Sequence, residues 1–114
     1  QYTAAALCNE LQTIASPASV GNVSTSAGIE DYNSMGATAC HLLRQSVEHV
    51  RAIIAIELLV AAEGIEHQRP LQSGQGVERA HEQIRSLVPP LTADRPPSQD
   101  IATISGMIAK GLSV

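Results

Sequence analysis

The sequence predicts an all-α fold with one long central helix and shorter flanking helices. Apolar residues recur at three- and four-residue steps over most of the 114 residues, which is the spacing of one face of a helix. No segment shows the alternating pattern of a strand. Apolar residues make up 44% of the chain but aromatic residues only 2%, with no Phe and no Trp. Small side chains bury little area each, so we expect the chain to gain much of its stability by packing on something else.

The first predicted helix runs from Gln1 to about Ser16. It ends before Pro17, because a proline disfavours the helical conformation of the residue that precedes it. No capping residue precedes Gln1, so we expect the chain to begin inside a helix of a longer polypeptide. Residues 17–29 are rich in Ser, Gly, Asn and Thr and are predicted to form a loop. Loops of this length are uncommon in compact domains unless they are functional, which favours an active-site-type loop.

A long helix is predicted over residues 31–63. Glu30 or Asp31 would stand at its start, where the positive end of the helix dipole favours a carboxylate. At 1.5 Å per residue this helix would be about 45–50 Å long, more than an isolated domain of this size needs. From Ala52 to Ala62 the pattern is apolar nearly all round, which predicts burial on every side. Such a surface favours a bundle shared between subunits.

Two shorter helices are predicted, joined by a crossing that contains four prolines. One covers residues 77–88, and the other follows Ser98 as its N-cap and runs to about Lys110. Gly64 is the predicted end of the long helix, since glycine is the commonest residue just past a helix terminus. Cys8 and Cys40 lack the spacing of a metal site or a redox motif. Both are predicted to be small buried residues.

Charge and spacing exclude several classes of function. The net charge is −4 without a basic cluster, so neither nucleic acid nor an anionic membrane is an expected partner. The longest apolar run is too short for a membrane span of ~20 residues, and no secretion signal is visible, so we expect a soluble cytoplasmic protein. No third ligand stands at metal-binding spacing from any histidine, so no metal site is predicted. The histidines are His41, His49, His67 and His81.

Four motifs follow one another along the chain. They are Pro-Ala-Ser-Val at 17–20, Ser-Thr-Ser-Ala-Gly at 24–28, Glu-Asp-Tyr-Asn-Ser-Met-Gly at 30–36 and Ala-Ile-Glu-Leu-Leu at 55–59. Together, in this order and spacing, they resemble the C-terminal part of histidine ammonia-lyase and of its aromatic amino acid lyase relatives. The resemblance covers nearly the whole chain, and it implies that the chain is a segment of a larger helical-bundle enzyme.

The resemblance implies that Glu30 is both the catalytic and the substrate-binding residue of this segment. In the family, the glutamate of this motif faces the substrate, contacts its amino group or ring and assists proton transfer. A carboxylate at the edge of a closed site suits a base, since desolvation raises its pKa. Without the resemblance, the simpler interpretation of Glu30 is a carboxylate that stabilises a helix start. Asp31 is predicted to be a cap or anchor, and Asn33, Ser34 and Met35 are predicted to support the loop.

The resemblance also implies a prosthetic group that this chain cannot form. The family uses the electrophile 4-methylidene-imidazol-5-one (MIO), which arises from an internal Ala-Ser-Gly. This chain contains no Ala-Ser-Gly. The implied source of MIO is therefore the N-terminal part of the same enzyme, and the chain alone is expected to be inactive. The complete enzyme is implied to be a homotetramer that eliminates ammonia from L-histidine to give trans-urocanate.

Two alternatives stay open. Ile29 and Tyr32 depart from the histidine-specific pattern, in which Gln and His are common at these positions. A related lyase or aminomutase acting on tyrosine or phenylalanine is therefore one alternative, although Glu30 favours histidine. The other alternative, from a different class, is a free-standing helical interaction module without activity. The start at Gln1 without a cap favours the enzyme segment over the module.

Overall fold

The computed structural model describes residues 1–111, and it confirms the all-α prediction. The elements, in order, are α1 (Tyr2–Ile14), the 3-10 turns η1 (Ala18–Gly21) and η2 (Ser26–Gly28), α2 (Gly36–Gln68), α3 (Gln75–Arg85) and α4 (Ser98–Lys110). Within these described residues the extended backbone pairs only in one isolated bridge. The sequence suggested one segment, whereas the chain forms two compact units, residues 1–50 and the part from Arg51 onward.

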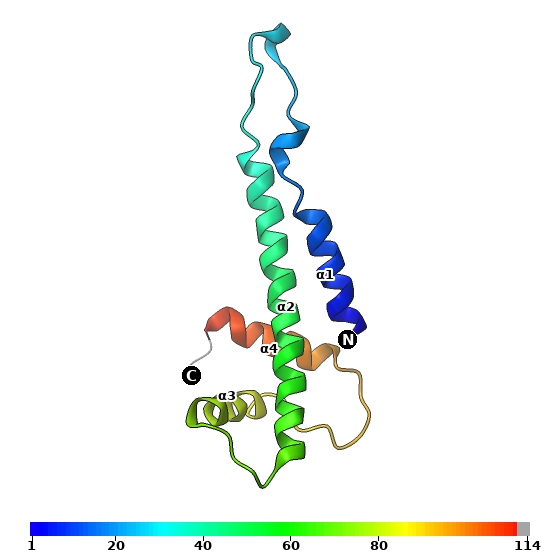
Figure 1. Cartoon of the computed structure of the whole chain (residues 1–114), viewed down its shortest axis with the longest axis vertical. Helices are drawn as coiled ribbons and strands as arrows, with labels where there is room; N and C mark the ends of the chain where they lie inside the picture. Colours follow the sequence, from blue (N-terminus) through cyan, green and yellow to red (C-terminus); the bar gives the residue numbers. More distant parts are fainter. Residues whose placement is uncertain (112–114) are drawn as a thin grey trace. The chain divides into compact units, whose positions relative to one another are not determined.

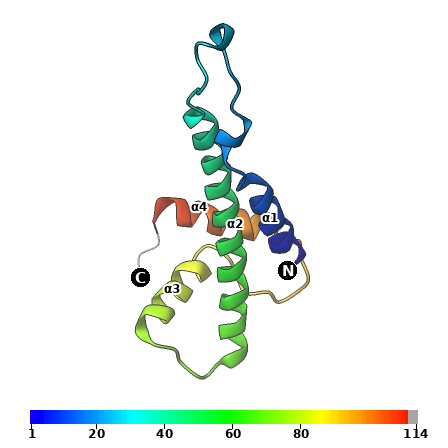
Figure 2. The ribbon, with the colours of Figure 1, turned by 45° about the horizontal axis from the view of Figure 1, so that its top comes forward.

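The first unit pairs α1 with the first part of α2. The two helices lie side by side, and the chain that joins them forms a hairpin that extends beyond the N-terminal end of α2 (Figures 1 and 2). Glu10 on α1 reaches His49 on α2, with 3.1 Å between the carboxylate oxygen and Nε2. No residue among 1–50 is fully buried. The seam between the helices is made of half-buried side chains, which include Leu7, Leu11, Ile14 and Leu42.

The long helix begins at Gly36, five residues later than the predicted start at 31. The residues before it cannot join the helix, because the backbone N–H and C=O of Asn33 both bind the side chain of Asn22. The first turn of α2 accordingly contains no acidic residue. The helix-start interpretation of Glu30 and the cap interpretation of Asp31 are therefore wrong.

The same helix continues past Gly64 to Gln68, five residues beyond the predicted end at 63. A glycine inside a helix costs roughly 1 kcal/mol, which tertiary contacts can offset. Here Glu63 and Glu66, in the last turns of α2, both bind Arg85 on α3. The helix ends just before an Arg-Pro pair, where the residue that precedes proline is disfavoured in a helix.

The second unit contains the hydrophobic core. Ala55 and Ala62 lie seven residues apart on one face of α2, and their small side chains leave room for apolar residues from the other elements. The buried partners are Ile84, Val88 and Ile104. Helix α4 ends at the predicted Lys110, but Ser98 is its first helical residue and Pro97, not Ser98, is its N-cap. Helix α3 begins two residues earlier and ends three residues earlier than predicted.

Several side chains that were predicted to be buried are exposed in this chain. Cys8 and Cys40 are free, exposed thiols, because the first unit has no core to receive them. Along residues 52–62, Ala55 and Ala62 are buried, but Ile54 and Val60 are 39% and 64% exposed. The all-round burial predicted for this stretch is not reached by contacts within the described residues.

Of the helices formed by residues 1–111, none combines the length and apolarity that a membrane span requires.

Candidate active-site hairpin

The hairpin between α1 and α2 carries the residues of the Ser-Thr-Ser-Ala-Gly and Glu-Asp-Tyr-Asn motifs. Thr25 and Glu30 form an antiparallel bridge near its tip. The N–H of Thr25 donates to the carbonyl of Glu30 at 2.8 Å, and the N–H of Glu30 donates to the carbonyl of Thr25 at 3.2 Å. The Ser24 hydroxyl donates to the same Glu30 carbonyl at 3.3 Å. The backbone of Glu30 is therefore held at both of its polar groups.

The tip of the hairpin is strained. Ser26, Ala27 and Gly28 have φ angles of 52°, 54° and 87°, so three successive residues adopt the left-handed region. Glycine adopts this region without a steric penalty, whereas each L-residue there costs roughly 1–2 kcal/mol. Backbone of this kind persists only where surrounding contacts determine the conformation.

Two asparagines below the tip provide such contacts. The N–H of Asn33 donates to Oδ1 of Asn22 at 3.0 Å, and Nδ2 of Asn22 donates to the carbonyl of Asn33. The side chain of Asn33 adds two bonds, since its Nδ2 donates to the Val23 carbonyl at 2.7 Å and its Oδ1 accepts from the Thr25 hydroxyl at 3.3 Å. We call these four bonds the Asn22–Asn33 clasp. The sequence predicted a supporting role for Asn33 but missed its partner Asn22.

The carboxylate of Glu30 is exposed at this pinned position. Within residues 1–111 it accepts no hydrogen bond and pairs with no cation, and the same is true of Asp31. A shallow hollow of about 380 Å³ lies beside the base of the hairpin and includes Tyr32, Ser34 and Met35 in its lining, but not Glu30. The hairpin thus presents a free carboxylate on a fixed backbone, without a closed cavity around it.

The histidines of the first unit make separate contacts. His49 pairs with Glu10, and the ring of His41 lies 3.5 Å from the amide nitrogen of Gln45. In the part of the chain that the structure describes, no three His, Cys, Asp or Glu side chains are grouped so that they could hold a metal ion.

A cluster of charged side chains in the second unit joins the end of α2 to α3. Arg85 lies 3.0 Å from Glu63 through Nη2 and 3.0 Å from Glu66 through Nε, and His81 reaches Glu66 at 2.9 Å through Nε2. Burial alone would raise the pKa of Glu66, but hydrogen bonds from Arg85 and His81 lower it overall. Opposite charges therefore compensate one another where the two helices meet.

The cluster continues through Arg69, whose guanidinium binds both carboxylate oxygens of Glu78 at 3.1 and 2.8 Å. This pair and the Ser73 N–H, which donates at 2.7 Å, lower the pKa of Glu78 from 4.5 to about 2. Arg69 also lies 3.4 Å from Nδ1 of His81. Because an arginine can only donate, Nδ1 is the acceptor and Nε2 carries the proton that binds Glu66. These mutual contacts join α3 to the end of α2.

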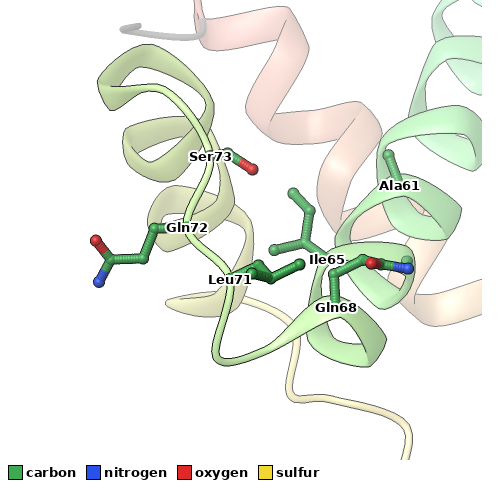
Figure 3. A pocket seen from close by; sticks show the side chains of 7 residues that line it. Ala61, Ile65, Gln68, Leu71, Gln72 and Ser73 are labelled. Atoms are coloured by element: carbon green, nitrogen blue, oxygen red, sulfur yellow. The ribbon is translucent and has the colours of Figure 1, made fainter.

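A pocket in the second unit lies between the end of α2 and the turn that leads to α3 (Figure 3). Ile65 and Leu71 point toward each other inside it, while Gln72 points away. Its lining contains amides, one hydroxyl and apolar side chains but no carboxylate, histidine or cysteine. This pocket offers no acid or base, so the hairpin is the better candidate for a catalytic site.

Comparison with known proteins gives one family. The model of the aromatic amino acid lyase family matches residues 1–86. The histidine ammonia-lyase of Deinococcus radiodurans is 45% identical over 111 residues, which is 97% of this chain and 21% of that protein. The histidine ammonia-lyase of Anaeromyxobacter sp. is also 45% identical, over 97% of this chain and 22% of its own length.

Solved structures agree with the sequence comparison. The crystal structure of histidine ammonia-lyase from Trypanosoma cruzi matches with a TM-score of 0.91 and 40% identity, over 96% of this chain and 22% of that one. A tyrosine aminomutase matches with a TM-score of 0.89 and 30% identity, over 96% of this chain and 21% of that one. The chain therefore spans about a fifth of the length of these relatives. By sequence and by structure, the chain belongs to the aromatic amino acid lyase family.

Proposed function

We propose that this chain forms one wall of the active site of an ammonia-lyase that converts L-histidine to trans-urocanate and ammonia. The observation that carries the proposal is the free carboxylate of Glu30, exposed on a hairpin whose backbone is fixed on both sides. The choice of histidine rests on relatives that are histidine ammonia-lyases at 45% identity.

The reaction needs a group of this kind. Elimination removes a proton from the β-carbon, expels the amino group as ammonia and leaves a carbon–carbon double bond. A carboxylate can accept a hydrogen bond from the substrate's ammonium or imidazole N–H, or take up a proton. A fixed backbone reduces the range of positions that the Glu30 carboxylate can adopt, and correct placement of a reacting group contributes strongly to rate.

The remaining groups come from outside this chain. In the family, the MIO group supplies an electrophile that makes the substrate's amine a better leaving group. This chain lacks the Ala-Ser-Gly precursor, and the hollow beside the hairpin does not include Glu30. We therefore propose that this chain supplies the Glu30 carboxylate and part of the scaffold. The prosthetic group would come from the N-terminal part of a longer polypeptide. Because it lacks the prosthetic group, the chain alone is expected to be inactive.

The exposed apolar face of α2 supports assembly with other helices. In the first unit, three side chains at successive four- and three-residue steps are between 44% and 63% exposed, namely Leu43, Val47 and Val50. A contiguous apolar face of this kind marks an interaction surface. We propose that it packs against the rest of the enzyme in a cytoplasmic homotetramer.

The test is the turnover of L-histidine by the complete polypeptide that carries this chain. Glu30→Gln keeps the size of the side chain and removes its charge, so we expect kcat to fall by about 10²–10⁴-fold, the usual contribution of acid–base catalysis. Asp31→Asn is the matched control, because Asp31 is the neighbouring carboxylate and is also exposed, and its kcat is expected to stay near that of the wild type. Unchanged kcat and KM in Glu30→Gln would remove Glu30 from the site.

A second candidate is a lyase or aminomutase that acts on tyrosine or phenylalanine. The similarity to a tyrosine aminomutase, 30% identical with a TM-score of 0.89, favours it, as do Ile29 and Tyr32. The same assay with L-tyrosine and L-phenylalanine separates the two. Turnover of an aromatic substrate without turnover of L-histidine overturns the histidine assignment, and turnover of none of the three favours a non-catalytic helical module.

A further inference from the structure

We propose that Asn22 and Asn33 are positioning residues, whose clasp holds Glu30 at the place where it acts. This inference rests on the proposed function of Glu30 and adds a device that the family match does not assign. The two asparagines stand on opposite arms of the hairpin, 11 residues apart, and neither of them contacts the Glu30 side chain.

The register of the hairpin shows what the clasp does. The Thr25–Glu30 bridge is the one rung that the backbone forms in this hairpin. Three residues before Thr25 stands Asn22, and three residues after Glu30 stands Asn33, so both pairs share one antiparallel register. In a regular ladder residues 22 and 33 would be a non-hydrogen-bonded pair, whose backbone groups do not bond to each other. Here the Asn22 carboxamide binds both the N–H and the C=O of Asn33, so a side-chain amide joins the two arms where the backbone forms no further rung.

The other two bonds of the clasp support the same conclusion. The Val23 carbonyl, which a further backbone rung would use, accepts from Nδ2 of Asn33 instead. The Thr25 hydroxyl, on the residue that bridges to Glu30, donates to Oδ1 of Asn33. Asn33 therefore contacts three residues of the opposite arm, and one of them is the direct backbone partner of Glu30.

Burial singles out the same two residues. From Ser19 to Ser34 every residue is exposed except Asn22 and Asn33, which are half-buried. Partial burial shields the two bonds between the Asn22 side chain and the Asn33 backbone from competing water. They lie directly beneath a tip in which Ser26 and Ala27 hold left-handed backbone, and contacts of this kind are what keeps such backbone in one conformation.

The test is a double-mutant cycle in the complete polypeptide. Asn22→Leu is close in size to asparagine and removes both of its hydrogen bonds. We expect kcat to fall by roughly 10–100-fold, because a displacement of about 1 Å can cost that much in rate. In a Glu30→Gln background the same change is expected to have no further effect, since no carboxylate remains to be positioned. Asn9→Leu is the matched control, an exposed asparagine on α1 outside the clasp, with kcat expected near wild type.

A second variant, which loses only one of the two Asn22 hydrogen bonds, tests whether the loss of kcat follows the number of bonds removed. Asn22→Asp keeps the oxygen that accepts from the Asn33 N–H and loses the amide that donates to the Asn33 carbonyl. Its kcat is expected to lie between those of the wild type and Asn22→Leu. If the clasp only stabilised the fold, Asn22→Leu would lower kcat by the same factor in the wild type and in Glu30→Gln. That result overturns the proposal. Unchanged kcat in Asn22→Leu beside a strong Glu30→Gln effect also overturns it, whereas a silent Glu30→Gln overturns the proposed function itself.

Discussion

Ile104 is the side chain whose removal is predicted to cost the second unit most. It is completely buried among Ile84, Val88 and the two buried alanines of α2. Ile104→Ala deletes three carbon groups, worth about 0.8 kcal/mol each in transfer free energy, and the cavity left behind adds to this sum. We expect the free energy of unfolding to fall by about 3–4 kcal/mol, a large share of the stability of a small domain.

Urea unfolding of the 114-residue chain, followed by far-UV circular dichroism, measures this loss. The chain concentration is kept low and constant, because linked association changes apparent stability. With an m-value of about 1.5 kcal/mol per molar urea, the midpoint is expected to fall by about 2–3 M. Ile29→Ala is the matched control, since Ile29 is 84% exposed on the hairpin, and it should change stability by less than about 0.5 kcal/mol. Equal losses in both variants would refute the assignment of the core.

Two further predictions concern acid stability and association. The pKa of Glu78 is lowered from 4.5 to about 2 in the fold, so its stabilising contribution is complete above about pH 4.5 and is lost as the pH falls toward 2. Acid denaturation followed by circular dichroism should show this loss in the wild type and less of it in Glu78→Gln; identical profiles would contradict the role of the Arg69–Glu78 pair. The isolated chain is expected to form oligomers or aggregates through the apolar surface of residues 52–62. Sedimentation measures this, and a stable monomer at high concentration would count against that surface.

The sequence predicted those elements whose signals are local. The end of α4 was correctly predicted at Lys110, because stop signals stand there, whereas Ser98 was predicted as the N-cap and is one residue inside the helix. Pro17 likewise ended the first predicted helix close to the true end of α1 at Ile14. Neither inference needs knowledge of a distant part of the chain.

The bounds of α2 could not be predicted in the same way, since both depend on partners far along the sequence. Its late start follows from Asn22 binding Asn33 across 11 residues. Its late end accompanies contacts from Glu66 to His81 and Arg85, which are 15 and 19 residues away. Helix periodicity alone carries no information on such pairings.

The candidate site was predicted unevenly. Glu30 was singled out by motif resemblance, whereas from local pattern alone it was assigned to a helix start that the structure does not form. Asn33 was expected to support the loop, but no local signal distinguished Asn22 from the other turn-forming residues of 17–29. The free thiols of Cys8 and Cys40 were expected to be buried because small apolar residues usually are, and the first unit has no core to bury them.

The most direct test of the central claim is a transplant of this chain into a relative. The chain replaces the matching segment of a histidine ammonia-lyase that is 45% identical to it, once with its own Glu30 and once with the Glu30→Gln substitution. We expect the chimera with Glu30 to produce urocanate from L-histidine, and the Glu30→Gln chimera to assemble equally well but turn over at least about 100-fold more slowly. Equal rates from two equally assembled chimeras would contradict the claim that this chain brings a catalytic carboxylate to the site.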